Sequence, residues 1–208
     1  MSRILSAVVL TILLQPVYAN ETAIDTANAD AAKTIVDELH NALLEIMRNG
    51  ASLGYNGRYE IIKPIIAESF DTPIISQVIM GRYWDDLDAD KQQEFMALFR
   101  ELSTATYANR FSEYADESFQ HVSVDSLNKG RLLVRTELIK AGGEKVKFDY
   151  LMHQRDSDWY IISVVAQGVN DLSMKRAEYN SVIQSSGFDA LFQTLQDKIA
   201  EMETTADL

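Results

Sequence analysis

The spacing of apolar and polar positions changes twice along the chain. Apolar residues recur every three to four positions up to Tyr114, alternate with polar residues between Phe119 and Gln167, and return to the first spacing after Asn170. A period near 3.6 indicates amphipathic helices, whereas a period of two indicates half-buried strands. Helices followed by antiparallel strands and then by further helices are typical of the α+β class.

The helical segments have recognisable start and stop signals. They are expected at residues 33–49, 61–66, 71–81 and 89–114, and as two helices after residue 170 separated by a break at residues 185–187. Asp71 followed by Pro73 is typical of a helix start, because the carboxylate caps free amides and proline fits the first turn. The large apolar side chains of segment 89–114 spread over roughly 220° at 100° per residue. Since a surface helix needs about half that width, this helix should face either core on two sides or a ligand cavity.

Four strands joined by tight turns are expected between the helical regions. They span residues 119–127, 131–140, 144–154 and 158–167. The turn sequences at 128–130 and 141–143 contain the Asn and Gly residues that short hairpins need. Alternation on the second and third strands gives one continuous apolar face. We therefore predict a four-stranded antiparallel meander curved against several helices, a cone-like fold with an internal apolar pocket.

The first nineteen residues have the pattern of a secretory signal peptide. Arg3 is followed by an apolar run at residues 4–14 and by a small-residue cleavage site ending at Ala19. Because the run is shorter than the roughly 20 residues that a membrane-spanning helix requires, we expect cleavage and export, with a signal anchor as the alternative. Residues 20–32 are then a flexible lead-in, 33–203 a single domain and 204–208 a tail; the protein is not expected to be integral to a membrane.

Composition narrows the possible chemistry. The chain has no cysteine, so it can form neither a disulfide nor a thiolate metal site, and its stability must come from packing. The formal net charge of −12 disfavours nucleic acid and anionic membrane surfaces as partners. We therefore expect no nucleic-acid binding.

No catalytic motif is evident. The three histidines, His40, His121 and His153, lack the spacing of metal ligands, so neither a metal site nor a cofactor is expected. One enzymatic alternative stays open: His121 or His153 could pair with Asp125 or Asp149 across strands and act as a general base inside a cone. A second alternative is an exported adaptor protein with a filled core.

Several short segments, taken in their order and spacing, are similar to a known family. They are Ser69-Phe70-Asp71, Gly81-Arg82-Tyr83-Trp84, Gln92-Gln93-Glu94-Phe95, Asp158-Trp159-Tyr160-Ile161-Ile162 and Gly187-Phe188-Asp189-Ala190-Leu191. With these segments the chain resembles the MlaC (toluene-tolerance, ABC-transporter auxiliary) family of periplasmic lipid carriers. Residues 176–191 are similar to its hopanoid-associated HpnM branch.

The resemblance implies a monomeric periplasmic carrier that needs no cofactor and catalyses no reaction. It would hold the tails of a phospholipid, or of another long-chain or polycyclic lipid, inside the cone with the head group outside. It would shuttle between an inner-membrane MlaD-type or exporter complex and an outer-membrane lipoprotein complex. The pocket lining expected from the apolar sheet face, the long helix and this resemblance is Phe99, Tyr107, Phe111, Val134, Phe148, Tyr150, Met152, Ile162 and Val164. The acidic charge departs from many members of the family and leaves the head-group contacts open.

Overall fold

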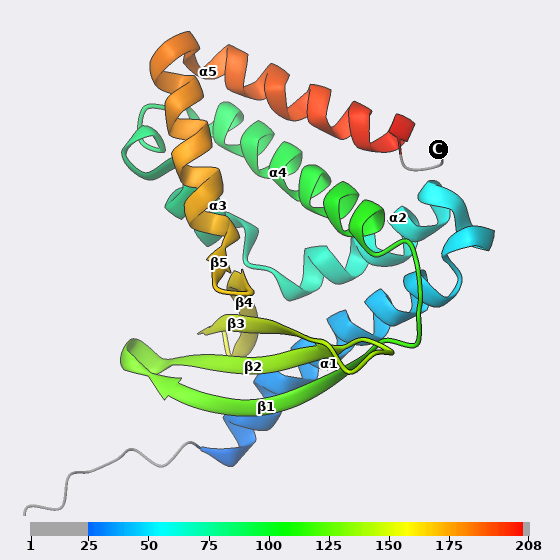
Figure 1. Ribbon diagram of the computed structural model, residues 1–208. Helices are drawn as coiled ribbons and strands as arrows, with labels where there is room; N and C mark the ends of the chain where they lie inside the picture. The colour runs from blue at the N-terminus through cyan, green and yellow to red at the C-terminus, as the bar shows by residue number, and fades with distance from the viewer. Residues whose placement is uncertain (1–24, 206–208) are drawn as a thin grey trace, which may run out of the picture.

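Within residues 25–205, which the computed structural model describes, helices and a sheet follow one another in the expected order (Figure 1). The elements are α1 (Thr26–Arg48), α2 (Gly50–Ser69), α3 (Thr72–Met80), the 3₁₀ turn η1 (Gly81–Tyr83), α4 (Ala89–Arg110), β1 (Ser118–Leu127), the turn η2 (Asn128–Gly130), β2 (Arg131–Ile139), β3 (Lys145–Arg155), β4 (Asp158–Ala166), β5 (Val169–Asn170) and α5 (Asp171–Thr205). The expected signal peptide and the end of the expected tail lie outside these residues.

The α+β class and the antiparallel meander are confirmed. The strand order is β1-β2-β3-β4-β5 and every neighbouring pair is antiparallel. The two-residue strand β5 was not expected, because two residues are too short to give an alternating pattern. It follows a turn in which Gln167 and Gly168 both have positive φ, and it pairs with the end of β4.

The buried face of the sheet packs against α1, which lies behind the strands in Figure 1. The fully buried side chains of this interface include Val36 and Leu39 on α1 and Val134 and Met152 on the sheet. The expected inward positions of β2 are indeed the buried ones, since its burial alternates residue by residue. This first core also takes in α2 and the end of α4.

A second core lies among α3, the first half of α4 and α5. It is built on Phe95, which packs against the rings of Tyr179 and Phe192 at centroid distances of 6.2 and 6.3 Å. Helix α4 therefore contributes to both cores, which explains the wide apolar arc of its sequence. Phe70 and Met202 contact both cores and lie at the junction between them.

Helix α1 begins at Thr26, so the expected flexible lead-in at residues 20–32 is wrong for its second part. Asp25 caps the helix by accepting a hydrogen bond of 3.1 Å from the amide of Ala27. Ala32 is fully buried. The small, polar residues before Lys33 carry too few large apolar side chains to produce a helical pattern, although alanine favours helix strongly.

Two other boundaries differ from expectation and one agrees. The gap between the expected helices at 33–49 and 61–66 is helical in the structure except for a kink at Gly54, whose φ of 58° and ψ of −177° interrupt α2. Helix α4 ends at Arg110 rather than at Tyr114. The break in α5 occurs at Gly187, where φ is 84°, as the turn-forming residues indicated.

Helix α1 also carries a buried histidine. His40 Nε2 lies 3.0 Å from the hydroxyl of Tyr150, and its ring stacks on Phe119 with a centroid distance of 3.7 Å. The pKa of His40 is lowered to about 3, chiefly by burial and secondly by the charge of His121, against an opposing effect of Asp37. His40 is therefore neutral in the folded protein at neutral pH.

This histidine should make the folded state less stable in weak acid. The folded pKa lies below the unfolded value of 6.5, so between pH 6.5 and 3 the unfolded chain binds more protons. The free energy of unfolding should then fall by up to about 1.4 kcal/mol per pH unit in that window and not change through His40 above it. Urea unfolding at pH 7.5, 6 and 5 measures this effect.

The control for this experiment is His40→Gln, which removes the titrating group. The variant should lose less stability than the wild-type protein between pH 6.5 and 5. Equal losses in the two proteins would contradict the assignment to His40.

Candidate functional site

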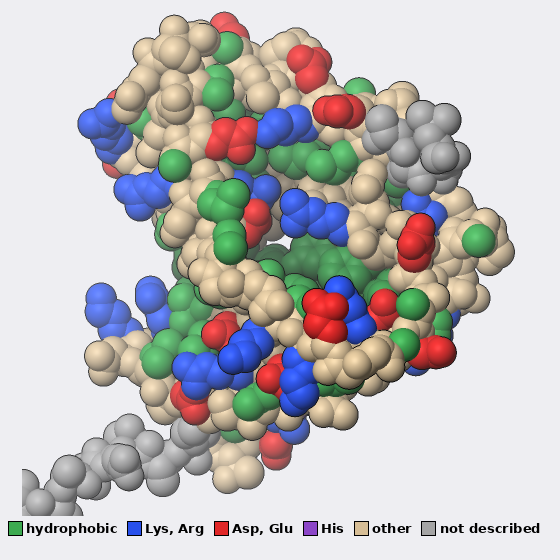
Figure 2. All heavy atoms as spheres, in the orientation of Figure 1, with side chains coloured by type: hydrophobic (Ala, Val, Ile, Leu, Met, Phe, Trp, Pro, Cys, Tyr) green, Lys and Arg blue, Asp and Glu red, His purple; other side chains and the backbone are tan. Residues whose placement is uncertain are grey.

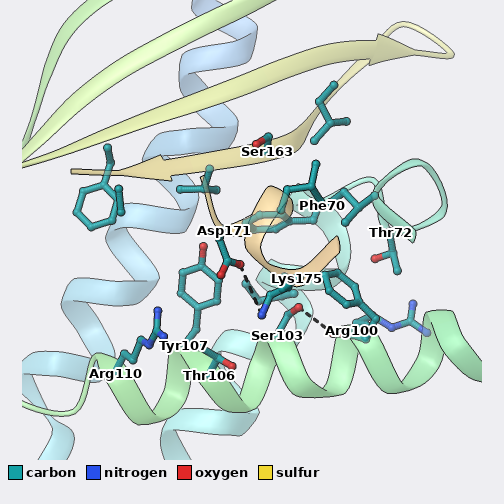
Figure 3. A pocket seen from close by; sticks show the side chains of 18 of the residues that line it. Phe70, Thr72, Arg100, Ser103, Thr106, Tyr107, Arg110, Ser163, Asp171 and Lys175 are labelled. Atoms are coloured by element: carbon teal, nitrogen blue, oxygen red, sulfur yellow. Dashed lines mark hydrogen bonds and ion pairs between the residues drawn. The ribbon is translucent and has the colours of Figure 1, made fainter. Parts of the chain in front are cut away.

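A cavity of about 260 Å³ lies between α4 and the sheet, at the junction of the two cores (Figure 3). On the same side of the molecule Figure 2 shows a hollow with hydrophobic side chains on its floor and with both basic and acidic side chains near its rim. The lining residues are Ile66, Phe70, Thr72, Ile75, Phe99, Arg100, Ser103, Thr106, Tyr107, Arg110, Phe111, Phe148, Ile162, Ser163, Val164, Ala166, Asp171, Leu172 and Lys175.

Helix α4 supplies one wall because its cavity-facing residues share one helical face. Phe99, Ser103, Tyr107 and Arg110 are spaced by three or four positions, and such residues lie one above the other on a helix. The hydroxyl of Ser103 donates to the carbonyl of Phe99 at 2.8 Å, so it is already satisfied within the helix. Thr106 likewise donates to the carbonyl of Leu102 at 2.7 Å, so both hydroxyls in the middle of this wall are bonded within the helix.

Strand β4 supplies the opposite wall with consecutive residues. Ile162, Ser163 and Val164 all line the cavity, which a regular strand would not permit. The register explains it: Leu151 pairs with Ser163 and Met152 with Ile161, so Ile162 is the extra residue of a β-bulge. The bulge interrupts the alternation and turns an additional side chain inward.

The expected pocket residues divide into two groups. Phe99, Tyr107, Phe111, Phe148, Ile162 and Val164 line the cavity. Val134, Tyr150 and Met152 do not line it. They are buried in the first core, where α1 covers that end of the sheet. The hydroxyl of Tyr150 lies 3.0 Å from Nε2 of His40 on α1.

Sequence reasoning missed the wall formed by α2, α3 and the start of α5. Ile66, Phe70 and Ile75 lie there, and the ring of Phe70 lies 6.0 Å from that of Tyr107. The segment around Phe70 was recognised in the sequence, but nothing in it indicated which element it would face. Leu172 completes this wall from the first turn of α5.

Charged residues gather at the mouth of the cavity. Arg100 and Arg110 extend from α4, while Lys175 and Asp171 come from α5 (Figure 3). Lys175 Nζ lies 3.6 Å from Asp171 Oδ2, whereas neither arginine forms an ion pair with an acid among residues 25–205. Three cations therefore oppose one carboxylate at the mouth of an acidic protein.

Tyr107 presents the one phenol in the cavity wall. Burial raises its pKa, the charge of Asp171 acts in the same direction, and Arg110 acts against both. The phenol is therefore protonated at neutral pH and can donate a hydrogen bond. Its hydroxyl lies within the electrostatic influence of both charged neighbours.

The histidines of the enzymatic alternative lie outside the cavity. His121 Nε2 is 2.5 Å from Asp37 Oδ1, and His153 Nε2 is 2.8 Å from Asp71 Oδ2. Neither histidine is among the cavity-lining residues. The hypothesis that one of them acts as a base inside the cone is therefore wrong in that form.

Asp125 and Asp149, the carboxylates expected beside those histidines, form ion pairs with an arginine instead. Arg135 pairs with Asp125, and its Nε lies 3.9 Å from Asp149 Oδ1. These three residues lie next to one another across β1, β2 and β3. They form an ion-pair row on the sheet, not a proton-transfer site.

In the described part of the chain, no helix combines the length and the apolar character that crossing a bilayer would take.

Two comparisons with known proteins are informative. The family model described as MlaC protein matches residues 37–197. Among solved structures, the chain is similar to the phospholipid-binding protein from Ralstonia solanacearum, solved in complex with a phospholipid. The two share 20% sequence identity over 83% of this chain and 97% of that chain, with a TM-score of 0.72. At this identity the likeness supports the fold.

Proposed function

Because this chain belongs to the MlaC family, we propose that it is a periplasmic lipid carrier that encloses the apolar tails of a phospholipid and leaves the head group at the cavity mouth. The observation that carries the proposal is the cavity between α4 and the sheet, lined by aromatic and aliphatic side chains. Such a lining suits flexible hydrocarbon.

The energetics of tail transfer support a closed carrier. Each buried methylene contributes about 0.8 kcal/mol, so a sixteen-carbon tail gains on the order of 12 kcal/mol from leaving water. Movement between two membranes through water therefore requires an apolar enclosure. Release must then be assisted by a partner that opens the enclosure.

The size of the cavity indicates that it widens when a lipid enters. A cavity of about 150 Å³ accommodates benzene, so by proportion 260 Å³ holds about ten carbons, fewer than one long tail. The cavity lies where the two cores meet, with Phe70 in contact with both. Separating the two cores at this junction widens the cavity without exposing the centre of either.

The partners in this proposal follow from family membership. They are an inner-membrane MlaD-type or exporter complex and an outer-membrane lipoprotein complex. A hopanoid is the alternative cargo in this proposal, because residues 176–191 are similar to the HpnM branch. An adaptor role with a filled core is less favoured, since the space between α4 and β4 is not filled by side chains.

Lipid analysis of the purified protein tests the proposal. We expect native mass spectrometry to find a phospholipid bound after purification, or bound after incubation of delipidated protein with phospholipid vesicles. A hopanoid in its place would correct the cargo and keep the carrier. A protein that neither contains nor accepts any long-chain or polycyclic lipid would contradict the proposal, and undiminished partner binding by the delipidated protein would favour the adaptor.

A further inference from the structure

The charge at the cavity mouth is opposite in sign to the charge of the chain. The formal net charge of the whole sequence is −12, yet Arg100, Arg110 and Lys175 line the mouth against Asp171 alone. In a chain with fewer basic than acidic residues, a chance grouping would favour acids. The local excess of positive charge therefore calls for an explanation in terms of what binds there.

Two of the cations are placed to act together. Figure 3 shows Arg110 and Lys175 on either side of Tyr107, extending from α4 and α5 respectively. Arg100 lies ten residues before Arg110 on the same helix, which separates their α-carbons by about 15 Å along the axis. Asp171 and Arg110 both act electrostatically on the Tyr107 hydroxyl, and Lys175 lies 3.6 Å from Asp171, so Arg110 and Lys175 flank this hydroxyl while Arg100 lies farther along α4.

Asp171 occupies the place beside Lys175 that an external anion would take. It belongs to the first turn of α5, where the helix dipole favours negative charge, and it lies 3.6 Å from the ammonium of Lys175. Its side chain is 57% exposed, whereas that of Lys175 is 19% exposed. The carboxylate can therefore turn into solvent, while the lysine stays at the mouth.

We propose that the mouth selects lipids whose head group carries a net negative charge, with Arg110 and Lys175 binding the lipid phosphate and Asp171 acting as a competing anion. The inference rests on the proposed carrier function and specifies its substrate class. Arginine and lysine form charge-assisted hydrogen bonds to phosphate oxygens, and arginine can do so through two N–H groups. In a zwitterionic head group the ammonium would be repelled by the same basic residues. The net binding free energy of such a head group is therefore smaller.

The test is a competition between two lipids with identical tails. Delipidated protein is incubated with vesicles of equal parts phosphatidylglycerol and phosphatidylcholine, and the bound lipids are quantified by mass spectrometry. We expect the bound lipid to contain about three times as much phosphatidylglycerol as phosphatidylcholine, or more, at low salt. A partly exposed charge pair contributes enough free energy for a ratio of this size. The enrichment should decrease at about 1 M salt, where the Debye length is about 3 Å.

Variants with opposite expected signs locate the effect. Arg110→Gln and Lys175→Gln should each lower the enrichment towards one, whereas Asp171→Asn should raise it. Arg100→Gln removes the same charge from the same helix and should have a smaller effect than Arg110→Gln. Lys129→Gln should have no effect on the enrichment, because Lys129 lies in the exposed turn η2 before β2 and does not line the cavity.

The outcomes separate this inference from the carrier function. Bound lipid in the same ratio as in the vesicles, unchanged in all variants, would overturn the selectivity and keep the carrier. Equal effects of Arg100→Gln and Arg110→Gln would overturn the assigned phosphate position. Loss of bound phosphatidylglycerol on adding equimolar inorganic phosphate would indicate a site for free phosphate instead of a lipid head group.

Discussion

Replacing Ser103 by tryptophan should reduce lipid loading at least tenfold while the protein stays folded. Ser103 lies in the middle of the α4 wall and its side chain is small, so an indole there projects into the 260 Å³ cavity (Figure 3). Losing room for only two methylenes costs about 1.6 kcal/mol, which is more than tenfold in affinity. We therefore expect bound phospholipid to decrease at least tenfold, measured by native mass spectrometry after incubation with vesicles.

The matched control is Ser181→Trp, the same change at an exposed position of α5. It should leave lipid loading at the wild-type level. Circular dichroism and thermal unfolding of both variants establish that they are folded. Normal loading of a folded Ser103→Trp protein would place the tails outside this cavity and would contradict the proposed site.

Replacing the buried Asp71 by alanine should strongly destabilise the fold. Asp71 is fully buried between α2 and α3, and its Oδ2 accepts hydrogen bonds of 2.8 Å from both His153 and Arg155 on β3. Its Oδ1 also caps α3 through the amide of Ile74 at 3.2 Å. One carboxylate thus ties the α2–α3 junction to the sheet.

Its removal leaves two donors without their acceptor and α3 without its cap. Breaking a buried ion pair from one side costs about 3–5 kcal/mol, and we expect a value of about 3 because Arg155 is partly exposed and can reach water. Urea unfolding measures the loss. Asp71→Asn, which retains a capping oxygen, should lose less.

Asp88→Ala is the control for capping alone. Asp88 caps α4 through the amide of Lys91 at 2.8 Å and is exposed. Its loss should cost about 1 kcal/mol. Equal effects of Asp71→Ala and Asp88→Ala would show that the contacts of Asp71 with β3 contribute little.

The local elements of this fold could be predicted from the sequence because their causes are local. The alternation in β2 predicted one inward face, and its alternate residues Leu132, Val134, Thr136 and Leu138 are buried. Asp71 before Pro73 predicted the start of α3, and Gly187 the break in α5. The start of α1 was missed, since small residues before Lys33 give no periodic signal.

Which apolar side chains make core and which make a cavity was decided only by the tertiary structure. Phe148 and Tyr150 follow the same alternation on one strand, yet Phe148 lines the cavity and Tyr150 lies under α1. The difference depends on where α1 crosses the sheet, and no residue near either position encodes that crossing by itself. The bulge at Ile162 likewise becomes visible only in the pairing of β3 with β4.

The same holds for the charged mouth. The sequence determined a strongly acidic chain, from which a positively charged site would not be expected. Folding brings Arg110 and Lys175, far apart in the chain, to opposite sides of Tyr107 (Figure 3). Periodicity and composition describe neighbours along the chain, whereas empty volume and local charge depend on how distant elements are placed in space.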